Sequence, residues 1–258
     1  MFRDEFGAVC NGAKGKLNLL NNNPVGYFIS AMVAGMFIAF GGFVMCTAGA
    51  VLTANGSTMT KVVMAATFAS ALSLVVMAGA ELFTGNNFVM AAAAFAKAIS
   101  WGEAIKLWVV CYIGNLVGSM LSALVFYLTG LPSGTTGEFF ASTAATKMAG
   151  TPVNLFFKAV LCNTLVCLAV WCGTKMKSES GKLIMIFWCI FVFVFCGFEH
   201  SIANMSVMAV GLLSPSGVED LSIAGYVSNL LWVTLGNMVG GICVVALPYY
   251  IIQKDKNS

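Results

Sequence analysis

The segment Glu81-Leu82-Phe83-Thr84-Gly85-Asn86 interrupts the chain directly after an apolar run from Val62 to Ala80 that predicts a membrane-spanning helix. A second segment, Glu199-His200-Ser201-Ile202-Ala203-Asn204, follows the apolar run from Leu183 to Phe198. Both have the spacing Glu-x-x-x-x-Asn, and apolar sequence resumes after each. Placing Asp, Lys or Arg at the centre of a spanning helix costs roughly 2.5–3.5 kcal/mol per residue. A chain with two polar breaks at this depth is therefore predicted to use them as parts of a pathway.

The composition places the whole chain in the membrane. It has 258 residues, of which 59% are hydrophobic and 9% charged, and its mean hydropathy is +0.91. Because a spanning helix needs about 20 apolar residues, we predict an all-α integral membrane domain over residues 24–252. An N-terminal segment (1–23), retained in the mature chain, and a C-terminal tail (253–258) flank it. The six expected spans lie near Val25–Thr53, Val62–Ala96, Ala104–Thr129, Pro152–Gly173, Leu183–Leu213 and Ala224–Ile252, the second and fifth being broken.

The basic residues predict the orientation of these spans. With a cytoplasmic N-terminus, ten of the 13 Lys and Arg residues fall on the inner side, and the other three, Lys61, Lys147 and Lys158, fall outside. This bias follows the positive-inside rule. It predicts that both termini are cytoplasmic in the plasma membrane of a prokaryote. The net charge of +3 then reports topology and indicates no nucleic-acid partner, whereas membrane lipid is an expected one.

A second duplicated signature indicates an internal repeat. Gly114-Asn115-Leu116-Val117-Gly118 and Gly236-Asn237-Met238-Val239-Gly240 are offset by 236 − 114 = 122 positions, and the two breaks by 199 − 81 = 118. Each half holds three spans, an odd number, so the second half must enter the membrane upside down. This 3+3 inverted repeat places discontinuous helices near the midplane, where a substrate site forms. The glycines themselves are interpreted as close helix-packing residues.

The residues of the breaks receive separate interpretations. Half-helices that begin near Asn86 and Ala203 would direct partial positive charge inward, which suits an anion. Glu81 and Glu199 are interpreted as structural carboxylates that accept backbone N–H bonds at the breaks. Irregular backbone at membrane depth needs local hydrogen-bond partners, and these are expected from the side chains of Thr84, Asn86, Ser201 and Asn204. Asn204 is also expected to line the pore.

His200 is the only histidine of the chain, and it lies inside the second break. An imidazole titrates near physiological pH, so it can offer a proton or a hydrogen bond to an anion without a permanent buried charge. A neutral core histidine is the plainer alternative, and the position in a broken helix favours function. The nine cysteines show no CxxC or Cys/His clustering, so no metal site, disulfide or cofactor is expected.

These motifs resemble those of the formate/nitrite transporter family, and the resemblance covers essentially all six spans. Its most specific parts are Glu81 to Asn86, Gly114 to Gly118, Asn163 with Val166-Cys167-Leu168-Ala169-Val170-Trp171, and Gly197 to Met205. Within the family, the chain is most similar to the hydrosulfide-channel branch. The resemblance implies an aquaporin-like fold, a homopentamer with one pore in each protomer, and passage of hydrosulfide, formate or nitrite.

The resemblance also implies roles for particular residues. His200 matches the central pore histidine, Thr84 the threonine that bonds near it, Asn163 a polar pore-side residue, and Lys147 the lysine that draws anions in. The residues implied in apolar constrictions are Phe68, Leu72, Leu82, Phe83 and Phe193. Without the resemblance, Lys147 would be read as an ordinary loop lysine, and Phe68, Leu72 and Phe193 as core or lipid-facing side chains.

The predicted function is a channel in which Lys147 concentrates anions and in which His200 and Thr84 replace lost water. His200 is expected to protonate the anion transiently, because a neutral molecule loses its water more cheaply than a charge does. A proton-coupled anion transporter remains an alternative. An aquaporin-type neutral-solute channel is a second one, disfavoured because Asn23-Pro24-Val25 occurs once with no duplicated Asn-Pro-Ala. An intramembrane enzyme is a third, but no catalytic motif such as His-Glu-x-x-His occurs, so none is expected.

Overall fold

The computed structural model describes residues 2–254, and the last residues of the predicted tail, 255–258, lie outside the described part. The described chain is helical throughout its regular structure, as predicted. The first half contains α1 (Arg3–Asn22), α2 (Pro24–Ala54), α3 (Thr60–Ala78), α4 (Phe83–Phe95) and α5 (Trp101–Leu128). The second contains α6 (Gly134–Met148), α7 (Pro152–Lys175), α8 (Glu179–Phe195), α9 (Ser201–Leu213), α10 (Ile223–Val239), the π-helix η1 (Gly240–Ala246) and α11 (Leu247–Gln253).

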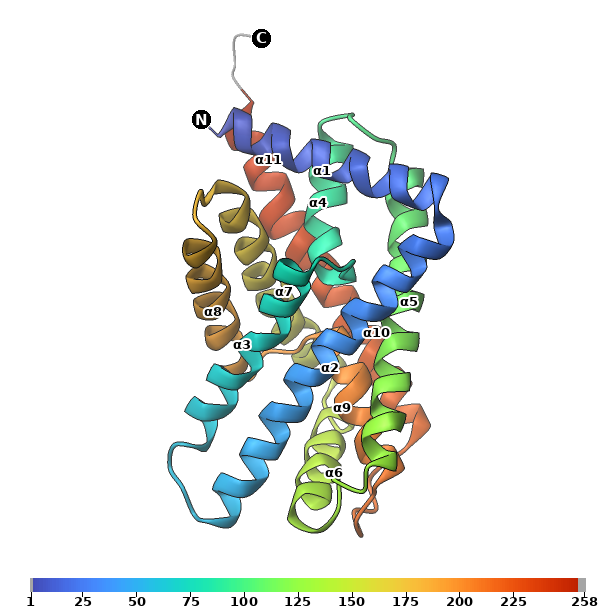
Figure 1. The fold of residues 1–258 in the computed structure, drawn as a ribbon, viewed down its shortest axis with the longest axis vertical. Helices are drawn as coiled ribbons and strands as arrows, with labels where there is room; N and C mark the ends of the chain where they lie inside the picture. Colours follow the sequence, from blue (N-terminus) through green and yellow to red (C-terminus); the bar gives the residue numbers. More distant parts are fainter. Residues whose placement is uncertain (1, 255–258) are drawn as a thin grey trace.

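The six predicted spans and both broken helices are confirmed. Within the described residues, five helical segments are long and apolar enough to cross a membrane, namely α2, α3, α5, α7 and the continuous α10–η1–α11. The second span is divided into α3 and α4, and the fifth into α8 and α9. In Figure 1, α4 runs from the middle of the bundle toward one end and α9 toward the other. The N-termini of both half-helices therefore lie near mid-depth.

The two halves are related by an inverted repeat. α2 packs on α5 in the first half as α7 packs on α10 in the second, and α3 packs on α8 between the halves. In Figure 1, α1 lies across the end of the bundle where the chain begins and ends, and α6 lies at the opposite end. Each half thus contributes one helix at a mouth and one half-helix at the centre.

Glycines of the duplicated motif allow these helix pairs to approach closely. A Cβ at Gly118 would overlap the carbonyl of Met32 on α2, and a Cβ at Gly240 would overlap the carbonyl of Val160 on α7. Small residues that let backbones meet are typical of membrane helix interfaces. The interpretation of these glycines as packing residues is therefore confirmed.

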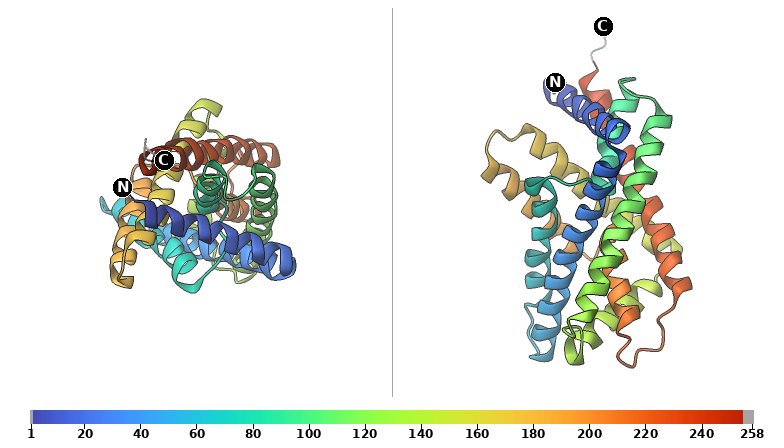
Figure 2. Two further views of the ribbon diagram at one scale, coloured as in Figure 1. Left: turned by 90° about the horizontal axis from the view of Figure 1, so that it is seen from above. Right: turned by 45° about the vertical axis from the view of Figure 1, so that its right-hand side comes forward.

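Two mouth helices complete the bundle. The segment between the third and fourth spans, read from the sequence as a connection, contains α6, whose Phe140 and Ala144 are buried. It is too short and too polar to register as a span. The helix α1 buries one face through Phe6, Val9, Ala13, Leu17 and Leu20, a spacing that repeats every three or four residues. Figure 2 shows α1 lying across the other helices.

Candidate functional site

The Gly-Asn motif residues Asn115 and Asn237 hold the two helix breaks together. Asn115 Oδ1 accepts from the N–H of Phe83 (2.9 Å), and its Nδ2 donates to the carbonyls of Ala31 (2.7 Å) and Glu81 (2.9 Å). Asn237 repeats this pattern on Ser201 N–H (2.9 Å), Ala159 O (2.8 Å) and Glu199 O (3.0 Å). Each amide thus satisfies the backbone that a break leaves unpaired, as membrane depth requires.

This role of the asparagines was missed in the sequence, where the motif served only as evidence of duplication. The available signal was that the Asn offset, 237 − 115 = 122, nearly equals the 118-residue offset of the breaks. The half-helices also begin earlier than expected. α4 begins at Phe83 rather than near Asn86, and α9 at Ser201 rather than near Ala203, because the asparagine side chains accept from the first N–H of each helix.

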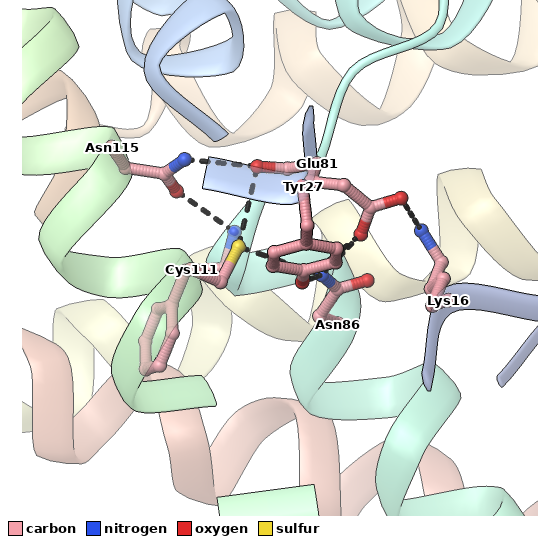
Figure 3. Close-up of polar contacts among 7 residues, drawn as sticks. Lys16, Tyr27, Glu81, Asn86, Cys111 and Asn115 are labelled. Carbon is pink, nitrogen blue, oxygen red and sulfur yellow. Dashed lines mark hydrogen bonds and ion pairs between the residues drawn. The ribbon is translucent and has the colours of Figure 1, made fainter. Parts of the chain in front are cut away.

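Glu81 lies in a polar cluster beside the first break (Figure 3). Its Oε1 accepts from Lys16 Nζ at 2.7 Å. Its Oε2 accepts from Asn86 Nδ2 at 2.9 Å and from the Tyr27 hydroxyl at 3.3 Å. Asn86 Nδ2 also contacts Cys111 Sγ at 3.5 Å.

Glu199 lies in the equivalent cluster beside the second break. Its Oε2 accepts from Lys147 Nζ at 2.8 Å and from Asn204 Nδ2 at 2.7 Å. Asn204 also donates to Asn229 Oδ1 at 2.9 Å, and Asn229 donates to the Lys147 carbonyl at 2.8 Å. The expectation that Glu81 and Glu199 accept backbone N–H bonds is therefore wrong. Side-chain donors occupy their carboxylates, since the motif asparagines already serve the backbone at the breaks.

The two cations come from the mouth helices. Lys16 lies on α1 and Lys147 on α6, and the exposed fractions of their side chains are 24% and 17%. Lys147 was predicted as a site residue but placed in a loop, whereas Lys16 was counted only for topology. Nothing local in the sequence marks Lys16, because its partner lies 65 residues away.

His200 and Thr84 meet at the centre. The His200 Nε2 and Thr84 Oγ1 atoms are 2.9 Å apart, and both side chains are buried. His200 is also the N-cap of α9, where its Nδ1 accepts from the N–H of Ala203 at 3.1 Å. A neutral imidazole carries one proton, and the nitrogen that accepts cannot hold it. The proton therefore lies on Nε2, which donates to Thr84 Oγ1.

Three adjoining cavities lie near this pair; His200 borders two of them, whereas the predicted site residue Thr84 borders none. The Lys16-side cavity has a volume of about 450 Å³ and is bordered by Lys16, Glu81, Leu72 and Leu82. The Lys147-side cavity has a volume of about 170 Å³ and includes Lys147, Glu199, His200 and Asn204 in its wall. Between them lies a central cavity of about 10 Å³. Its wall consists of Ile38, Phe68, Leu72, Leu82, Val166, Ile190, Phe193 and His200.

The walls that these cavities share define two apolar constrictions. Leu72 and Leu82 border both the Lys16-side and the central cavity. Phe68, Phe193 and His200 border both the central and the Lys147-side cavity. The Phe68 and Phe193 rings meet edge to face at 5.8 Å, and Phe193 stacks on His200 at 6.0 Å. Four of the five residues that the sequence placed in constrictions are thus brought together here.

Phe83 and Asn163 lie elsewhere. The Phe83 ring packs on Tyr112 of α5 at 5.0 Å and borders none of the three cavities. Asn163 is fully buried on α7, where its Nδ2 donates to the carbonyls of Thr84 (3.2 Å) and Asn237 (2.7 Å). Its contacts are those of a brace behind the pore.

The arrangement is that of a membrane protein with two larger cavities, a small apolar cavity between them and one buried imidazole in its wall. The chain belongs to the formate/nitrite transporter family, whose sequence profile matches residues 4–251. The members of this family that it resembles are channels and transporters rather than enzymes.

Individual relatives extend this comparison. The chain is 37% identical to the nitrite transporter NirC of Escherichia coli (strain K12), covering 100% of this chain and 94% of NirC. Among solved structures, it is similar to an "FNT family ion channel" with a TM-score of 0.92 and 35% identity, covering 98% of this chain and 100% of that one. It is also similar to a "pentameric formate channel with formate bound", with a TM-score of 0.77 and 29% identity, covering 88% and 96%.

Proposed function

We propose that this protein is a channel for small monovalent anions of weak acids, with hydrosulfide favoured over formate and nitrite. The observation that carries the proposal is the buried His200, which lies 2.9 Å from Thr84 and is the one polar residue in the wall of a central cavity lined otherwise by apolar residues. By analogy with the pentameric relative, the working form is a homopentamer with one pore in each protomer. The bacterial relatives and the bias of basic residues support a prokaryotic plasma membrane with both termini cytoplasmic.

The two larger cavities are proposed to be vestibules that collect anions. Lys16 and Lys147 each lie in the wall of one vestibule, but each is paired with a glutamate. A paired lysine attracts an anion less than a free one does, because the pair carries no net charge. Salt further limits its reach to about 8–10 Å. The lysines therefore act locally, through a hydrogen bond to an anion that has already entered.

The central step is proposed to combine a hydrogen bond with neutralisation of the anion. An isolated anion loses far more hydration energy in an apolar constriction than a neutral acid does. When an anion reaches His200, the Nε2–H can turn from Thr84 Oγ1 to the anion and donate to it in place of water. For the imidazole to surrender this proton, Nδ1 would first have to be protonated, which would break its bond from Ala203 N–H. The neutralising proton is therefore proposed to be an excess proton of the bulk solution that reaches the anion through the vestibule water, so that no hydroxide is left behind. His200 then acts as a neutral donor, in place of the proton transfer from His200 expected from the sequence.

The size of the central cavity favours hydrosulfide. A cavity of about 10 Å³ is near the lower limit for holding one water molecule. Hydrosulfide has one non-hydrogen atom, whereas formate and nitrite have three. Each of the larger anions would have to displace the leucine or phenylalanine side chains further.

A proton-coupled transporter is the alternative, and the apolar wall of the central cavity supports it, because apolar surroundings favour a neutral acid over an anion. In the proposed channel, the neutralising proton returns to the vestibule that supplied it, so only the anion is transferred and the flux carries current. The reversal potential of that current is independent of the proton gradient. If the proton instead leaves with the acid on the far side, every anion moves with one proton and transport is electroneutral. Flux without current, in a direction that follows the proton gradient, would favour the coupled transporter.

The test is the flux of hydrosulfide, formate, nitrite, chloride and water into proteoliposomes at several pH values. Fast hydrosulfide, slower formate and nitrite and poor chloride are expected, since chloride is the anion of a strong acid and cannot be neutralised. Chloride flux equal to that of hydrosulfide would overturn the neutralisation step. Flux of water alone would favour a neutral-solute channel.

A further inference from the structure

Two asparagines behind the central pair leave polar atoms unpaired. Asn87 on α4 and Asn163 on α7 are both fully buried. Asn163 Nδ2 donates to Asn87 Oδ1 at 3.2 Å. Within the described part of the chain, Asn87 Nδ2 and Asn163 Oδ1 make no hydrogen bond, and neither does Ser201 Oγ. Buried side-chain polar atoms are nearly always bonded to protein or to ordered water, so these atoms indicate a further ligand.

The orientation of the Asn163 amide follows from its neighbours. Its Nδ2 faces three oxygen atoms, the carbonyls of Thr84 and Asn237 and Oδ1 of Asn87. Exchanging its O and N atoms would set an oxygen against three acceptors, which cannot bond. Asn163 Oδ1 is therefore the acceptor and Asn87 Nδ2 the donor that remain. One donor and one acceptor on an amide pair are the partners that a water molecule needs.

These amides lie on a closed circuit of contacts around the pore centre. Asn163 reaches the Thr84 carbonyl, and the Thr84 hydroxyl reaches His200. Asn163 also reaches the carbonyl of Asn237, whose Oδ1 accepts from the N–H of Ser201, the residue after His200. Rotation of the Asn163 side chain would therefore break its hydrogen bonds to the carbonyls of both Thr84 and Asn237.

The neighbouring helix is shaped around the same point. A Cβ at Gly241 would lie 2.8 Å from Asn87 Cβ, 3.0 Å from Asn163 Nδ2 and 3.1 Å from Cys167 Sγ. Gly241 belongs to η1, and π-helical turns are frequently found at functional sites. The corresponding stretch of the first half lies within the α-helix α5. The wide turn is thus a departure from the internal repeat at the place where the amide pair is packed.

We propose that an ordered water molecule binds at this pair, accepting from Asn87 Nδ2 and donating to Asn163 Oδ1, and that Asn87 is thereby a positioning residue for the Thr84–His200 pair. Water held in this way fixes the Asn163 amide and, through it, the Thr84 carbonyl. The positioning role rests on the proposed function, whereas the water site itself does not.

The first test is a density map of the wild-type channel at a resolution that shows ordered water. A peak is expected within hydrogen-bond distance, about 2.7–3.2 Å, of both Asn87 Nδ2 and Asn163 Oδ1. The proposal would be overturned by a map in which Asn87 Nδ2 bonds directly to Asn163 Oδ1, in addition to the bond from Asn163 Nδ2 to Asn87 Oδ1, and in which no water peak lies within hydrogen-bond distance of either amide. Neither outcome depends on which anion the channel passes.

The second test uses variants at position 87. Asn87→Leu removes the donor, Asn87→Ser retains a hydroxyl that can hold water, and Ser206→Ala is a control that deletes a buried hydroxyl bonded only within its own helix, to Ala203 O at 3.2 Å. Hydrosulfide and formate uptake should fall about tenfold in Asn87→Leu, which corresponds to about 1.4 kcal/mol in activation free energy. Asn87→Ser should recover most of it, and Ser206→Ala should match the wild type.

A spectroscopic readout separates positioning from loss of fold. Since His200 is the only histidine, ¹⁵N-histidine labelling reports it alone. The Nε2 resonance should shift in Asn87→Leu and return in Asn87→Ser. An assembled Asn87→Leu channel with wild-type uptake and an unchanged Nε2 resonance would overturn the positioning role. If Asn87→Leu does not assemble, Asn87→Ala, which also lacks the donor but has a smaller side chain, takes its place, and an unchanged Nε2 resonance and wild-type uptake in Asn87→Ala overturn the positioning role. If the Nε2 resonance shifts in Asn87→Leu but the wild-type protein takes up no weak-acid anion, only the proposed function is refuted.

Discussion

Replacing His200 tests whether the imidazole acts as a neutral hydrogen-bond donor. His200→Leu removes two contacts, the Nδ1 cap on Ala203 N–H (3.1 Å) and the Nε2 contact with Thr84 (2.9 Å). Losing a helix cap costs about 1 kcal/mol of stability. Losing a donor to a charged ligand costs about 2 kcal/mol, which corresponds to roughly a 30-fold lower rate. We therefore expect slightly less stable channels whose anion flux falls about 30-fold.

His200→Asn distinguishes the donor from a proton carrier. Asparagine is a favoured N-cap residue, so its side-chain oxygen can take over the bond from Ala203 N–H. Its amide still donates a hydrogen bond but does not titrate. We expect flux between those of the wild type and His200→Leu, with the wild-type dependence on pH. Stopped-flow uptake of hydrosulfide and formate by proteoliposomes from pH 5 to 8 measures both quantities.

Two results would refute this reasoning. Wild-type flux in His200→Leu across the whole pH range would show that no hydrogen bond from His200 is needed. Loss of pH dependence in His200→Asn, with its assembly intact, would show that the imidazole itself supplies the proton. The oligomeric state in detergent and the melting temperature serve as controls for assembly in both variants.

Three further predictions concern the vestibules and the helix packing. Lys147→Gln should reduce uptake more than the double variant Lys147→Gln/Glu199→Gln, because the single variant leaves the Glu199 carboxylate in the cavity wall without its cation, where it repels anions; equal uptake by the two would contradict the pairing at 2.8 Å. Gly118→Val should prevent assembly, judged by size-exclusion chromatography, since even a Cβ overlaps the Met32 carbonyl, and a normal elution profile would refute the close contact. Deleting residues 1–20 removes Lys16 from Glu81 and should alter pH-dependent closure, whereas unchanged flux at acidic pH would count against a gating role for α1.

Much of the fold follows from local sequence. The hydrophobic runs predict the spans to within a few residues, as for α7 at Pro152–Lys175 against the predicted Pro152–Gly173. The polar breaks predict discontinuous helices because lipid offers no partner for irregular backbone. The duplicated motifs predict the inverted repeat through the odd number of spans in each half. His200 was found for the same reason, as a titratable group within a break.

The sequence misled where function depends on partners distant along the chain. The carboxylate of Glu81 was expected to bond backbone, but Lys16, 65 residues away, binds it. α6 was read as a connection, since fifteen residues of mixed polarity produce no spanning signal. Asn163 was placed at the pore by resemblance, and the structure places it against the Thr84 and Asn237 carbonyls, 79 and 74 residues away.

By itself, the sequence determined which segments enter the membrane, where two of them break and that the two halves run in opposite directions. These properties depend on the transfer of side chains and backbone from water to lipid, which is set residue by residue. Only the tertiary structure decided which lysine pairs with which glutamate, which nitrogen of His200 carries the proton and that Phe83 lies away from the cavities that the other four apolar residues border. Those properties depend on distances of a few ångströms between groups up to 116 residues apart, and hydrogen bonds weaken steeply when such distances or angles change.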